Sequence, residues 1–371
     1  MKKILHIQVL PKLSGVQRIS YEILKSLSSD EYDKYILFSD SQTTGDRQNL
    51  IDMFSAVGVK VLFSSKLKRE ICWSDFEALM EIYQLCREFR FDIVHTHSTK
   101  PGIIGRIAAT TARVPLIVHT VHGLSFHKFI RFPKWQFYWM CEMMASLFCD
   151  RIVLVNKYYR RYFHWLGEKV STIYNGIDFK NLSPISVARN YQSENLKFLF
   201  VGRLDAQKNP IMLLQVAKKL IEKYPSVSFS IVGDGELYSQ CESFIHAHHM
   251  GDNIHLIGWQ NNVEEYYLLH DIFIIPSIYE AFGLIFLEAG YNKLPVIATN
   301  VEGIPEVVKD GHTGLLSPPN DIDSMVQNCE RLILNPKLRK ALGENGYKRV
   351  TTMFSVQKMT TGYINIYDSL R

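Results

Sequence analysis

The sequence predicts an α/β protein built from two doubly wound domains. The chain has 371 residues, a length that suits two domains of ordinary size. In both halves, short apolar runs alternate with segments of helical periodicity, as in parallel sheets covered by helices on both faces. A polar stretch at Phe179–Glu194 interrupts this alternation and is predicted to link the two domains.

The first half opens with an apolar run that is followed by apolar residues at helical spacing from Val16 to Leu27. Another helix is expected at Asp75–Phe89. Short apolar runs that end near polar residues indicate buried parallel strands running into loops. Such runs occur at Lys3–Gln8, Tyr35–Ser39, Val59–Phe63, Asp92–His95, Pro115–His119, Arg151–Val155 and Val170–Ile173.

The second half repeats the pattern and ends in an amphipathic tail at Ser355–Leu370. Its expected strands are Lys197–Val201, Ser228–Val232, Asn253–Ile257, Ile272–Pro276 and Pro295–Thr299. Its expected helices are Pro210–Tyr224, Leu237–His248, Val263–His270, Leu284–Asn292 and Ile304–Val308. Ligands of such sheets bind beyond the carboxyl ends of the strands, so two facing domains are expected to place both ligand edges in one cleft.

Composition and charge narrow the class of protein. The net charge of +5 is too small to indicate nucleic acid, and it suits an anionic small molecule, an anionic membrane surface or ordinary variation. The six cysteines show no zinc spacing, and the first apolar run is too short for a signal peptide. No window approaches the ~18 apolar residues of a membrane span. We therefore expect a cytoplasmic protein whose membrane contact, if present, is peripheral.

The segment EAFGLIFLEAG carries two carboxylates near a helix start, Glu280 and Glu288. Gly283 lies where the helix should begin, and a helix N-terminus offers unpaired N–H groups that suit a phosphate. Both carboxylates are placed to accept hydrogen bonds from sugar hydroxyls. The alternative is that Glu280 only caps the helix and Glu288 lies on the surface.

The segment VGRLDAQKNP places two cations after a buried strand that ends in Gly202. Arg203 can contact two phosphate oxygens and Lys208 supplies a point charge, which together would neutralise a departing diphosphate. A solvated basic loop is the alternative. Gly233 marks a tight turn after another strand, a weak signal when taken alone.

Three polar segments in the first half follow expected strands. In HTVHGLSFH, His122 precedes a glycine turn and is a candidate site residue. In DIVHTHSTK, His97 and Lys100 could contact an acceptor phosphate, although core packing explains one histidine equally well. Gly15 allows close backbone approach at the first helix, but its surroundings lack the GxGxxG pattern, so bound NAD is not proposed.

Taken together, these segments resemble glycosyltransferase family 4 over nearly the whole chain. EAFGLIFLEAG is similar to the family's E-x7-E motif, and VGRLDAQKN is similar to its diphosphate loop. YNGID is similar to the segment that leads into the family's domain linker, and VEGIPEVVKDGHTGLL is similar to the stretch after the last strands of its C-terminal domain. DIVHTHSTKPGIIGR and HTVHGLSFH resemble the bacterial capsule and exopolysaccharide branch. The resemblance implies a GT-B fold: an acceptor domain at 1–185, a nucleotide-sugar domain at 186–352 and a helix at 353–371 that returns to the first domain.

The resemblance also implies roles for individual residues. Glu280 would bind the donor sugar's hydroxyls, Glu288 the ribose, and Arg203 with Lys208 the diphosphate. The remaining donor-site residues would be Phe282, Gly283, Leu284, Ile285, Gly202 and Gly233. His122 would reach the donor sugar from the opposite domain, while Gly15, His97 and Lys100 would serve the acceptor or its phosphate. The family pattern implies no metal and no other cofactor.

The mechanism implied is front-face displacement with retention at the anomeric carbon. The leaving diphosphate oxygen would take the acceptor proton, so no side chain is assigned as general base, and the two-carboxylate glycosidase scheme does not apply. One departure from the family pattern concerns the first loop, which often has paired glycines, whereas Ser14 precedes Gly15 here. That departure affects the acceptor side more than donor binding.

An aromatic and basic segment beginning at Phe126 suits a bilayer interface. The residues expected to contact the membrane are Lys128, Arg131, Lys134, Trp135 and Trp139. The alternative is an aromatic helix packed on its own domain.

The resemblance to the capsule and exopolysaccharide branch favours a transferase that moves a sugar from a nucleotide-sugar to an undecaprenyl-diphosphate-linked saccharide. The donor is expected to be UDP-linked, with an N-acetylamino sugar as one option. It would act at the inner face of the plasma membrane in capsule or exopolysaccharide synthesis. A UDP-sugar epimerase of the same fold and a non-catalytic sugar-nucleotide-binding subunit are the alternatives. The aromatic and basic segment disfavours the first, and the intact Glu280, Glu288, Arg203 and Lys208 disfavour the second.

Overall fold

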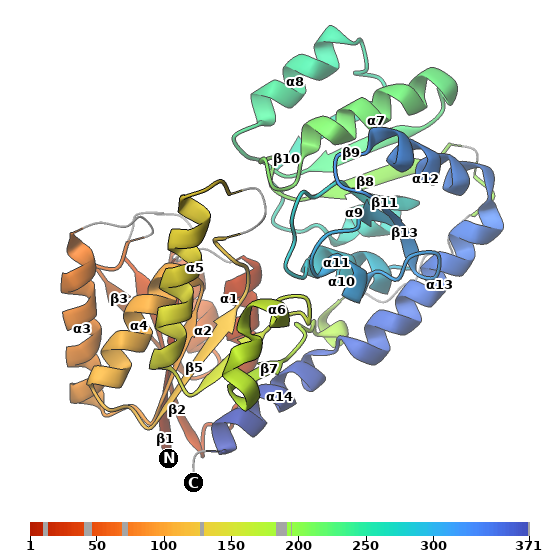
Figure 1. Ribbon diagram of the computed structural model, residues 1–371. Helices are drawn as coiled ribbons and strands as arrows, with labels where there is room; N and C mark the ends of the chain where they lie inside the picture. The colour runs from red at the N-terminus through yellow and green to blue at the C-terminus, as the bar shows by residue number, and fades with distance from the viewer. Residues whose placement is uncertain are drawn as a thin grey trace. The chain divides into compact units, whose positions relative to one another are not determined.

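The computed structural model describes residues 1–9, 14–40, 47–68, 73–126, 130–182, 191–193 and 195–369. The chain forms two compact units, which are considered separately (Figure 1). Unit 1 comprises Met1–Asn175 together with Val356–Arg371, and unit 2 comprises Gly176–Ser355.

Unit 1 is built on a parallel sheet of seven strands in the order β3-β2-β1-β4-β5-β6-β7. Its central strands are buried throughout, as expected of a sheet covered on both faces. The strands are β1 (Lys2–Ile7), β2 (Tyr32–Ser39), β3 (Val59–Ser64), β4 (Ile93–His97), β5 (Leu116–Val121), β6 (Arg151–Leu154) and β7 (Val170–Thr172).

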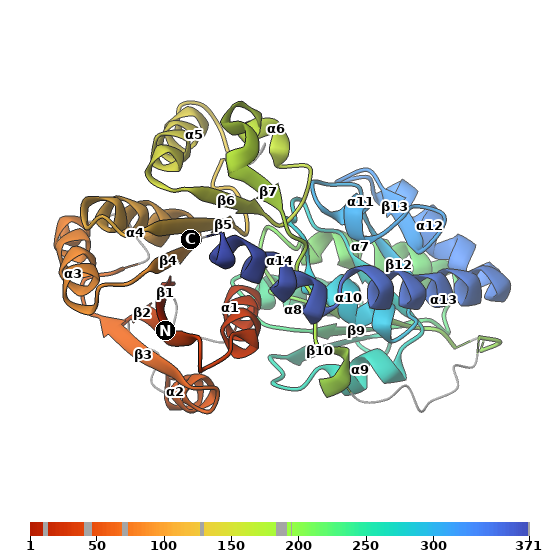
Figure 2. The ribbon, with the colours of Figure 1, turned by 90° about the horizontal axis from the view of Figure 1, so that it is seen from below.

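Helices cover this sheet, and the last helix of the chain is one of them. Figure 2 shows α14 beside α1, in agreement with their contacts. The helices are α1 (Gly15–Ser26), α2 (Arg47–Ser55), α3 (Ser74–Phe89), α4 (Thr99–Thr111), α5 (Lys134–Ala145), α6 (Arg160–Phe163) and α14 (Val356–Asp368). Short 3-10 turns lie at η1 (Ser146–Phe148) and η2 (His164–Lys169).

Unit 2 has a six-stranded parallel sheet in the order β10-β9-β8-β11-β12-β13. The strands are β8 (Lys197–Val201), β9 (Ser228–Val232), β10 (Ile254–Gly258), β11 (Ile272–Ile275), β12 (Val296–Thr299) and β13 (Gly314–Ser317). The helices are α7 (Pro210–Lys223), α8 (Tyr238–Ala247), α9 (Glu264–Leu269), α10 (Leu284–Tyr291), α11 (Ile304–Val307), α12 (Ile322–Leu334) and α13 (Pro336–Met353), with η3 at Phe179–Asn181.

Each sheet has one point at which the strand order reverses. In unit 1 this point lies between β1 and β4, and in unit 2 it lies between β8 and β11. Loops leaving the carboxyl ends of the two strands diverge at such a point, and ligands of open α/β sheets bind in the opening between them. The two reversal points therefore locate the parts of the chain to search for a site.

The predicted fold class of two doubly wound domains with a returning C-terminal helix is confirmed. The predicted strands are present, with ends that differ by at most three residues, and β13 was not anticipated. The units divide after Asn175 and after Ser355, whereas the sequence placed the boundaries at 185 and 352. The difference has a structural reason: Ile177 bridges to Ser355 and its N–H donates to the Phe354 carbonyl, so both crossing segments begin within unit 2.

Among the described residues, no helix has both the length and the apolar character needed to cross a bilayer.

Candidate active site

The reversal point of unit 2 brings together the loops that the sequence singled out. Arg203 and Lys208 follow β8, and Glu280 follows β11, the neighbouring strand. Ile278 N–H donates to the Gln207 carbonyl at 2.8 Å, which ties the two loops directly to one another. Segments some seventy residues apart in sequence thus form one cluster of charged groups, as this topology requires.

Lys208 and Glu280 form an ion pair in which both residues are almost buried, at 9% and 8% exposure. The Glu280 backbone is held as well, because its carbonyl accepts from the Gly303 N–H at 3.1 Å. Glu280 does not cap α10: the N-cap is Gly283, and no side chain caps that helix end. Desolvation makes an almost buried pair costly to break, so the pair fixes both side chains at the carboxyl edge of the sheet.

Arg203 remains the solvent-facing cation of this cluster, with its side chain 56% exposed. Its guanidinium donates to Gln207 Oε1 at 2.9 Å and pairs with Asp205 at 3.0 Å. Gln207 Nε2 also donates to the Tyr279 carbonyl at 3.1 Å. Gln207 and Asp205 therefore orient Arg203, a function that the sequence analysis missed because polar residues in a loop carry no periodic signal.

Gly202 and Gly233 bring the two loops on either side of Arg203 into backbone contact. A Cβ atom at position 233 would lie 1.9 Å from the Gly202 carbonyl oxygen, and the φ of Gly233 is +143°. Gly202 N–H also donates to the Val232 carbonyl at 3.0 Å. Because only glycine fits at position 233, the loops after β8 and β9 can contact each other there. This contact helps to hold the loop that carries Arg203 and Lys208.

The predicted residues around the start of α10 lie together at the same edge. Gly283 has φ +78°, a conformation that favours glycine, and it is followed by the partly exposed Leu284 and Ile285. Phe282 is buried, with its ring against Phe354. The first N–H groups of α10 therefore leave a glycine turn next to Glu280, where they can serve an anion.

Glu288 lies one turn inside α10 and is half-buried. Tyr267 of α9 donates its hydroxyl hydrogen to Glu288 Oε2 at 3.0 Å. The alternative of a surface carboxylate is therefore not supported, since a neighbouring helix holds this side chain. Tyr267 was not among the predicted residues.

The histidines of unit 1 form a buried hydrogen-bonded cluster rather than a row of exposed site residues. His97 is fully buried, and its Nδ1 lies 3.0 Å from His122 Nε2. Its Nε2 lies 3.1 Å from both His6 Nδ1 and Ser20 Oγ. Burial lowers the pKa of His97 and of the half-buried His122 below the ordinary histidine value, so both are neutral at pH 7.

The cluster continues toward the C-terminal helix. His95 contacts the Tyr367 hydroxyl at 2.6 Å and Thr120 at 2.8 Å, and Tyr367 lies 3.3 Å from His6. His97 therefore lies behind His122 and is placed to orient it, whereas the sequence analysis expected contact with an acceptor phosphate. His6, His95 and His97 offer ring nitrogens within 4.8 Å of one another, close enough to share a metal ion, although each ring already has hydrogen-bond partners.

Gly15 and Lys100 lie on opposite sides of the reversal point of unit 1. Gly15 is the first residue of α1, after β1, and Lys100 is the second residue of α4, after β4. Lys100 Nζ pairs with Asp75 of α3 at 2.6 Å, and its side chain is 14% exposed. Neither Ser14 nor Ser98, the N-caps of α1 and α4, forms a side-chain cap.

The predicted membrane residues fall on or just before α5. Arg131, Lys134 and Trp139 are exposed, whereas Trp135 is half-buried with its ring edge-on to the buried Phe126. Lys128 lies outside the described residues.

Two family models match consecutive halves of the chain. The model described as Glycosyltransferase Family 4 matches residues 13–181, and the model described as Glycosyl transferases group 1 matches residues 185–349. The first match includes β4, which carries His95 and His97, and the loop of His122 after β5, whereas His6 on β1 lies outside it. The second covers the Lys208–Glu280 pair.

Individual relatives agree with the family models. The chain is 31% identical to the UDP-Gal:alpha-D-GlcNAc-diphosphoundecaprenol alpha-1,3-galactosyltransferase of Escherichia coli, over 98% of this chain and 96% of the relative. It is 26% identical to the capsular polysaccharide biosynthesis glycosyltransferase CapM of Staphylococcus aureus, over 96% and 94% of the two chains.

Among solved structures, HepE of Anabaena in complex with UDP and glucose has a TM-score of 0.82 at 19% identity, with both chains fully covered. That likeness shows the GT-B fold, and the matched families and relatives show the activity class. The chain therefore belongs to glycosyltransferase family 4, in its bacterial capsular polysaccharide branch, and is a glycosyltransferase.

Proposed function

We propose that this glycosyltransferase moves a sugar from a UDP-sugar to a saccharide linked to undecaprenyl diphosphate, with retention at the anomeric carbon. The single observation that carries the proposal is the Lys208–Glu280 pair at the reversal point of unit 2. It combines a cation for a diphosphate with a carboxylate for sugar hydroxyls. The E. coli relative, named for UDP-galactose and a diphosphoundecaprenol acceptor, supports this choice of substrates.

The donor site follows from the charges in unit 2. Lys208 and the exposed Arg203 bind the donor diphosphate and stabilise the negative charge that grows as the glycosidic bond breaks. Lys208 contacts Glu280 in this structure, so a bound diphosphate would share that ammonium group. Glu280 then accepts hydrogen bonds from the sugar, while Glu288, held by Tyr267, accepts them from the ribose.

The proposed reaction needs no side chain as general base. The bond between the anomeric carbon and the diphosphate oxygen breaks, and the acceptor oxygen bonds to the same face of that carbon. The acceptor hydroxyl proton passes to the departing diphosphate oxygen, so atoms and charge balance without an enzymic proton carrier. His122, kept neutral by burial, contacts the transferred sugar as a hydrogen-bond partner.

The acceptor is assigned to unit 1. Gly15 and Lys100 lie at the reversal point of its sheet and serve the acceptor phosphate. The exposed Arg131, Lys134 and Trp139 on and before α5 contact the inner face of the plasma membrane, where a lipid-linked substrate is available. The product extends a capsular or exopolysaccharide repeat unit.

A direct test measures UDP release from a panel of UDP-sugars, with and without a synthetic GlcNAc-diphosphate lipid. We expect one donor to support release that depends on the lipid, and the product's anomeric coupling constant in a proton NMR spectrum to match that of the donor. Conversion of the UDP-sugar without transfer would indicate an epimerase instead. An inverted product would contradict retention, and binding without turnover for every pair would indicate a binding subunit.

A further inference from the structure

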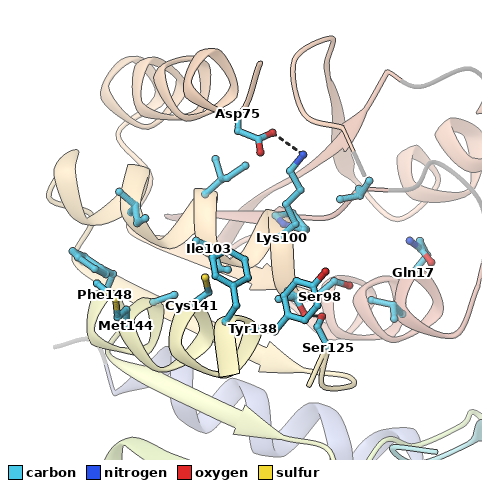
Figure 3. A pocket seen from close by; sticks show the side chains of 18 of the residues that line it. Gln17, Asp75, Ser98, Lys100, Ile103, Ser125, Tyr138, Cys141, Met144 and Phe148 are labelled. Carbon is cyan, nitrogen blue, oxygen red and sulfur yellow. Dashed lines mark hydrogen bonds and ion pairs between the residues drawn. The ribbon is translucent and has the colours of Figure 1, made fainter. Parts of the chain in front are cut away.

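Unit 1 contains a large pocket that the proposed donor chemistry does not use. Its volume is about 1160 Å³, slightly above the roughly 300–1,000 Å³ of ordinary ligand sites. Figure 3 shows the pocket between α3, α4 and α5, with Asp75 and Lys100 paired across it. Its lining also includes Val9, which follows β1, and residues after β4, so it opens at the reversal point of the sheet.

One part of the pocket is apolar, and two helices contribute to it at helical spacing. α4 contributes Ile103, Ile104 and Ile107. α5 and the turn after it contribute Phe137, Cys141, Met144 and Phe148. A buried ion pair between Arg106 and Glu142, at 2.9 Å, fixes α5 against α4. α4 and α5 are therefore fixed relative to one another where they border this part of the pocket.

The other part of the pocket is polar. Ser14, Gln17, Ser98, Thr99 and Ser125 line it, and Figure 3 shows Gln17, Ser98 and Ser125 away from Met144 and Phe148. Two helices, α1 and α4, begin here, and both N-caps lack a side-chain cap. The first N–H groups of the two helices make this end favourable for an anion, and Lys100 lies beside them, paired with Asp75.

The backbone of Ser98 is a separate sign of a functional role. Ser98 has φ +64° and ψ 164°, a strained combination for a residue with a side chain. Strain of this kind persists where the surrounding structure enforces it, and it concentrates at ligand sites.

The helices that border the pocket also carry exposed apolar side chains. On α3 and its N-cap these are Trp73, Phe76 and Met80, at 99%, 70% and 38% exposure and at positions that share one helix face. On α5 and its turn they include Met140, Met144 and Leu147, at 48%, 59% and 62%. Exposed apolar groups around a pocket suit contact with a membrane, which also supplies an apolar ligand.

We infer that this pocket binds the carrier end of the lipid-linked acceptor, with the diphosphate at the N-termini of α1 and α4 and the first isoprenoid units between α4 and α5. The inference rests on the proposed function for the choice of acceptor and adds where its lipid lies. The amphipathic lining selects this occupant, because a soluble saccharide leaves the apolar walls uncovered and a simple fatty chain leaves the anion site empty. The exposed faces of α3 and α5 let the remaining lipid stay in the bilayer.

The test is equilibrium binding of farnesyl diphosphate to the full chain, compared with inorganic pyrophosphate and with farnesol. We expect farnesyl diphosphate to bind at least about tenfold more tightly than either of its parts, because only it fills both ends of the pocket. Equal affinity for farnesyl diphosphate and pyrophosphate would overturn the inference, since no apolar subsite would then contribute.

Two adjacent residues of α5 provide a matched pair of variants. Cys141 lines the pocket, whereas Met140 does not. We expect Cys141→Trp to weaken farnesyl diphosphate binding about tenfold or more, with Met140→Trp close to the wild type. A second pocket variant, Ile103→Glu, adds charge with little added volume and covers the case in which Cys141→Trp fails to fold, as judged by circular dichroism. Equal effects of the Cys141 and Met140 variants would contradict the inference.

Transfer experiments distinguish an error in the inferred lipid pocket from an error in the proposed reaction. Sugar transfer to both farnesyl-linked and phenyl-linked diphosphosaccharides with the same KM would overturn the pocket and keep the acceptor class. Tight farnesyl diphosphate binding without transfer to any diphosphosaccharide would keep the pocket and overturn the proposed reaction.

Discussion

The two units place their functional groups in opposite environments. In unit 2, charged residues gather at the edge of the sheet, where Arg203 remains in water and Lys208 pairs with Glu280. In unit 1, the corresponding edge carries neutral histidines in the interior and a pocket with apolar walls. Both edges are reversal points of the same kind of sheet.

The comparison teaches how one architecture would serve the two kinds of ligand that we propose. The nucleotide diphosphate that we propose for unit 2 would need fixed positive charges, and unit 2 holds Arg203 and Lys208 on the loop after β8, which meets the loop after β9 at Gly233. The amphipathic lipid that we propose for unit 1 would need apolar surface beside an anion site, and the pocket offers apolar residues of α4 and α5 beside two helix N-termini that have no side-chain cap. The sheet determines where a ligand site lies, and the loops and covering helices supply the side chains and N–H groups that line it.

The largest expected effect comes from breaking the charged cluster of unit 2. Lys208→Ala removes a cation that stabilises the departing diphosphate, and it should lower kcat by roughly 10²–10³-fold. Glu280→Gln should have a comparable effect on transfer. Steady-state kinetics at saturating donor measure both. The matched control is Lys219→Ala on α7, an exposed lysine paired with Asp323, which should retain wild-type turnover. Wild-type kcat in the Lys208 variant would remove this residue from the mechanism.

A second prediction tests whether backbone contact supports the cations. Gly233→Ala would place a Cβ atom 1.9 Å from the Gly202 carbonyl oxygen, so the loops must separate. We expect a loss of about 3 kcal/mol in the free energy of unfolding, together with weakened UDP binding. Urea denaturation and calorimetric titration measure the two effects. Gly251→Ala is the control because its Cβ would meet open space; equal stability of the two variants would show that the loop contact is unimportant.

A third prediction concerns the neutral histidines of unit 1. Burial lowers the pKa of His6 from 6.5 to about 3 in the folded protein. The unfolded chain therefore binds more protons between these values, so stability is complete above about pH 6.5 and declines as the pH falls. At pH 5 the loss from His6 alone should be about 2 kcal/mol.

Urea denaturation at pH 7.5, 6 and 5, followed by circular dichroism, measures this decline. His248→Gln, at an exposed histidine of unit 2, is the matched control variant. A stability that stays constant from pH 7.5 to pH 5 would show that the histidines are already accessible to protons, contrary to their burial.

The smallest expected effect is that of metal removal. Because diphosphate stabilisation is assigned to Lys208 and Arg203, dialysis against EDTA should change the transfer rate by less than about twofold. The same dialysis tests the histidine group of His6, His95 and His97 for a bound ion, using elemental analysis before and after. A rate that falls on dialysis and returns with added Mg²⁺ or Zn²⁺ would assign part of the diphosphate chemistry to a metal.

Local patterns in the sequence were enough to predict most of the fold and the charged cluster. The alternation of strands and helices and the terminal helix at Ser355–Leu370 are short-range signals that need no knowledge of contacts. Glu280, Glu288, Arg203 and Lys208 stand in contiguous motifs next to predicted strand ends. β13 escaped notice, because a four-residue strand without clear alternation leaves little periodic signal.

The sequence by itself determined the fold class, the glycine turns and the residue types at each strand end, because these depend on neighbours along the chain. Tertiary structure alone decided that Lys208 pairs with Glu280, that Gln207 orients Arg203, and that His97 lies buried behind His122. It also decided the pocket, whose walls come from α3, α4 and α5. These features arise from contacts between residues far apart in the chain, and their geometry depends on how helices pack on the sheet, which no local pattern encodes.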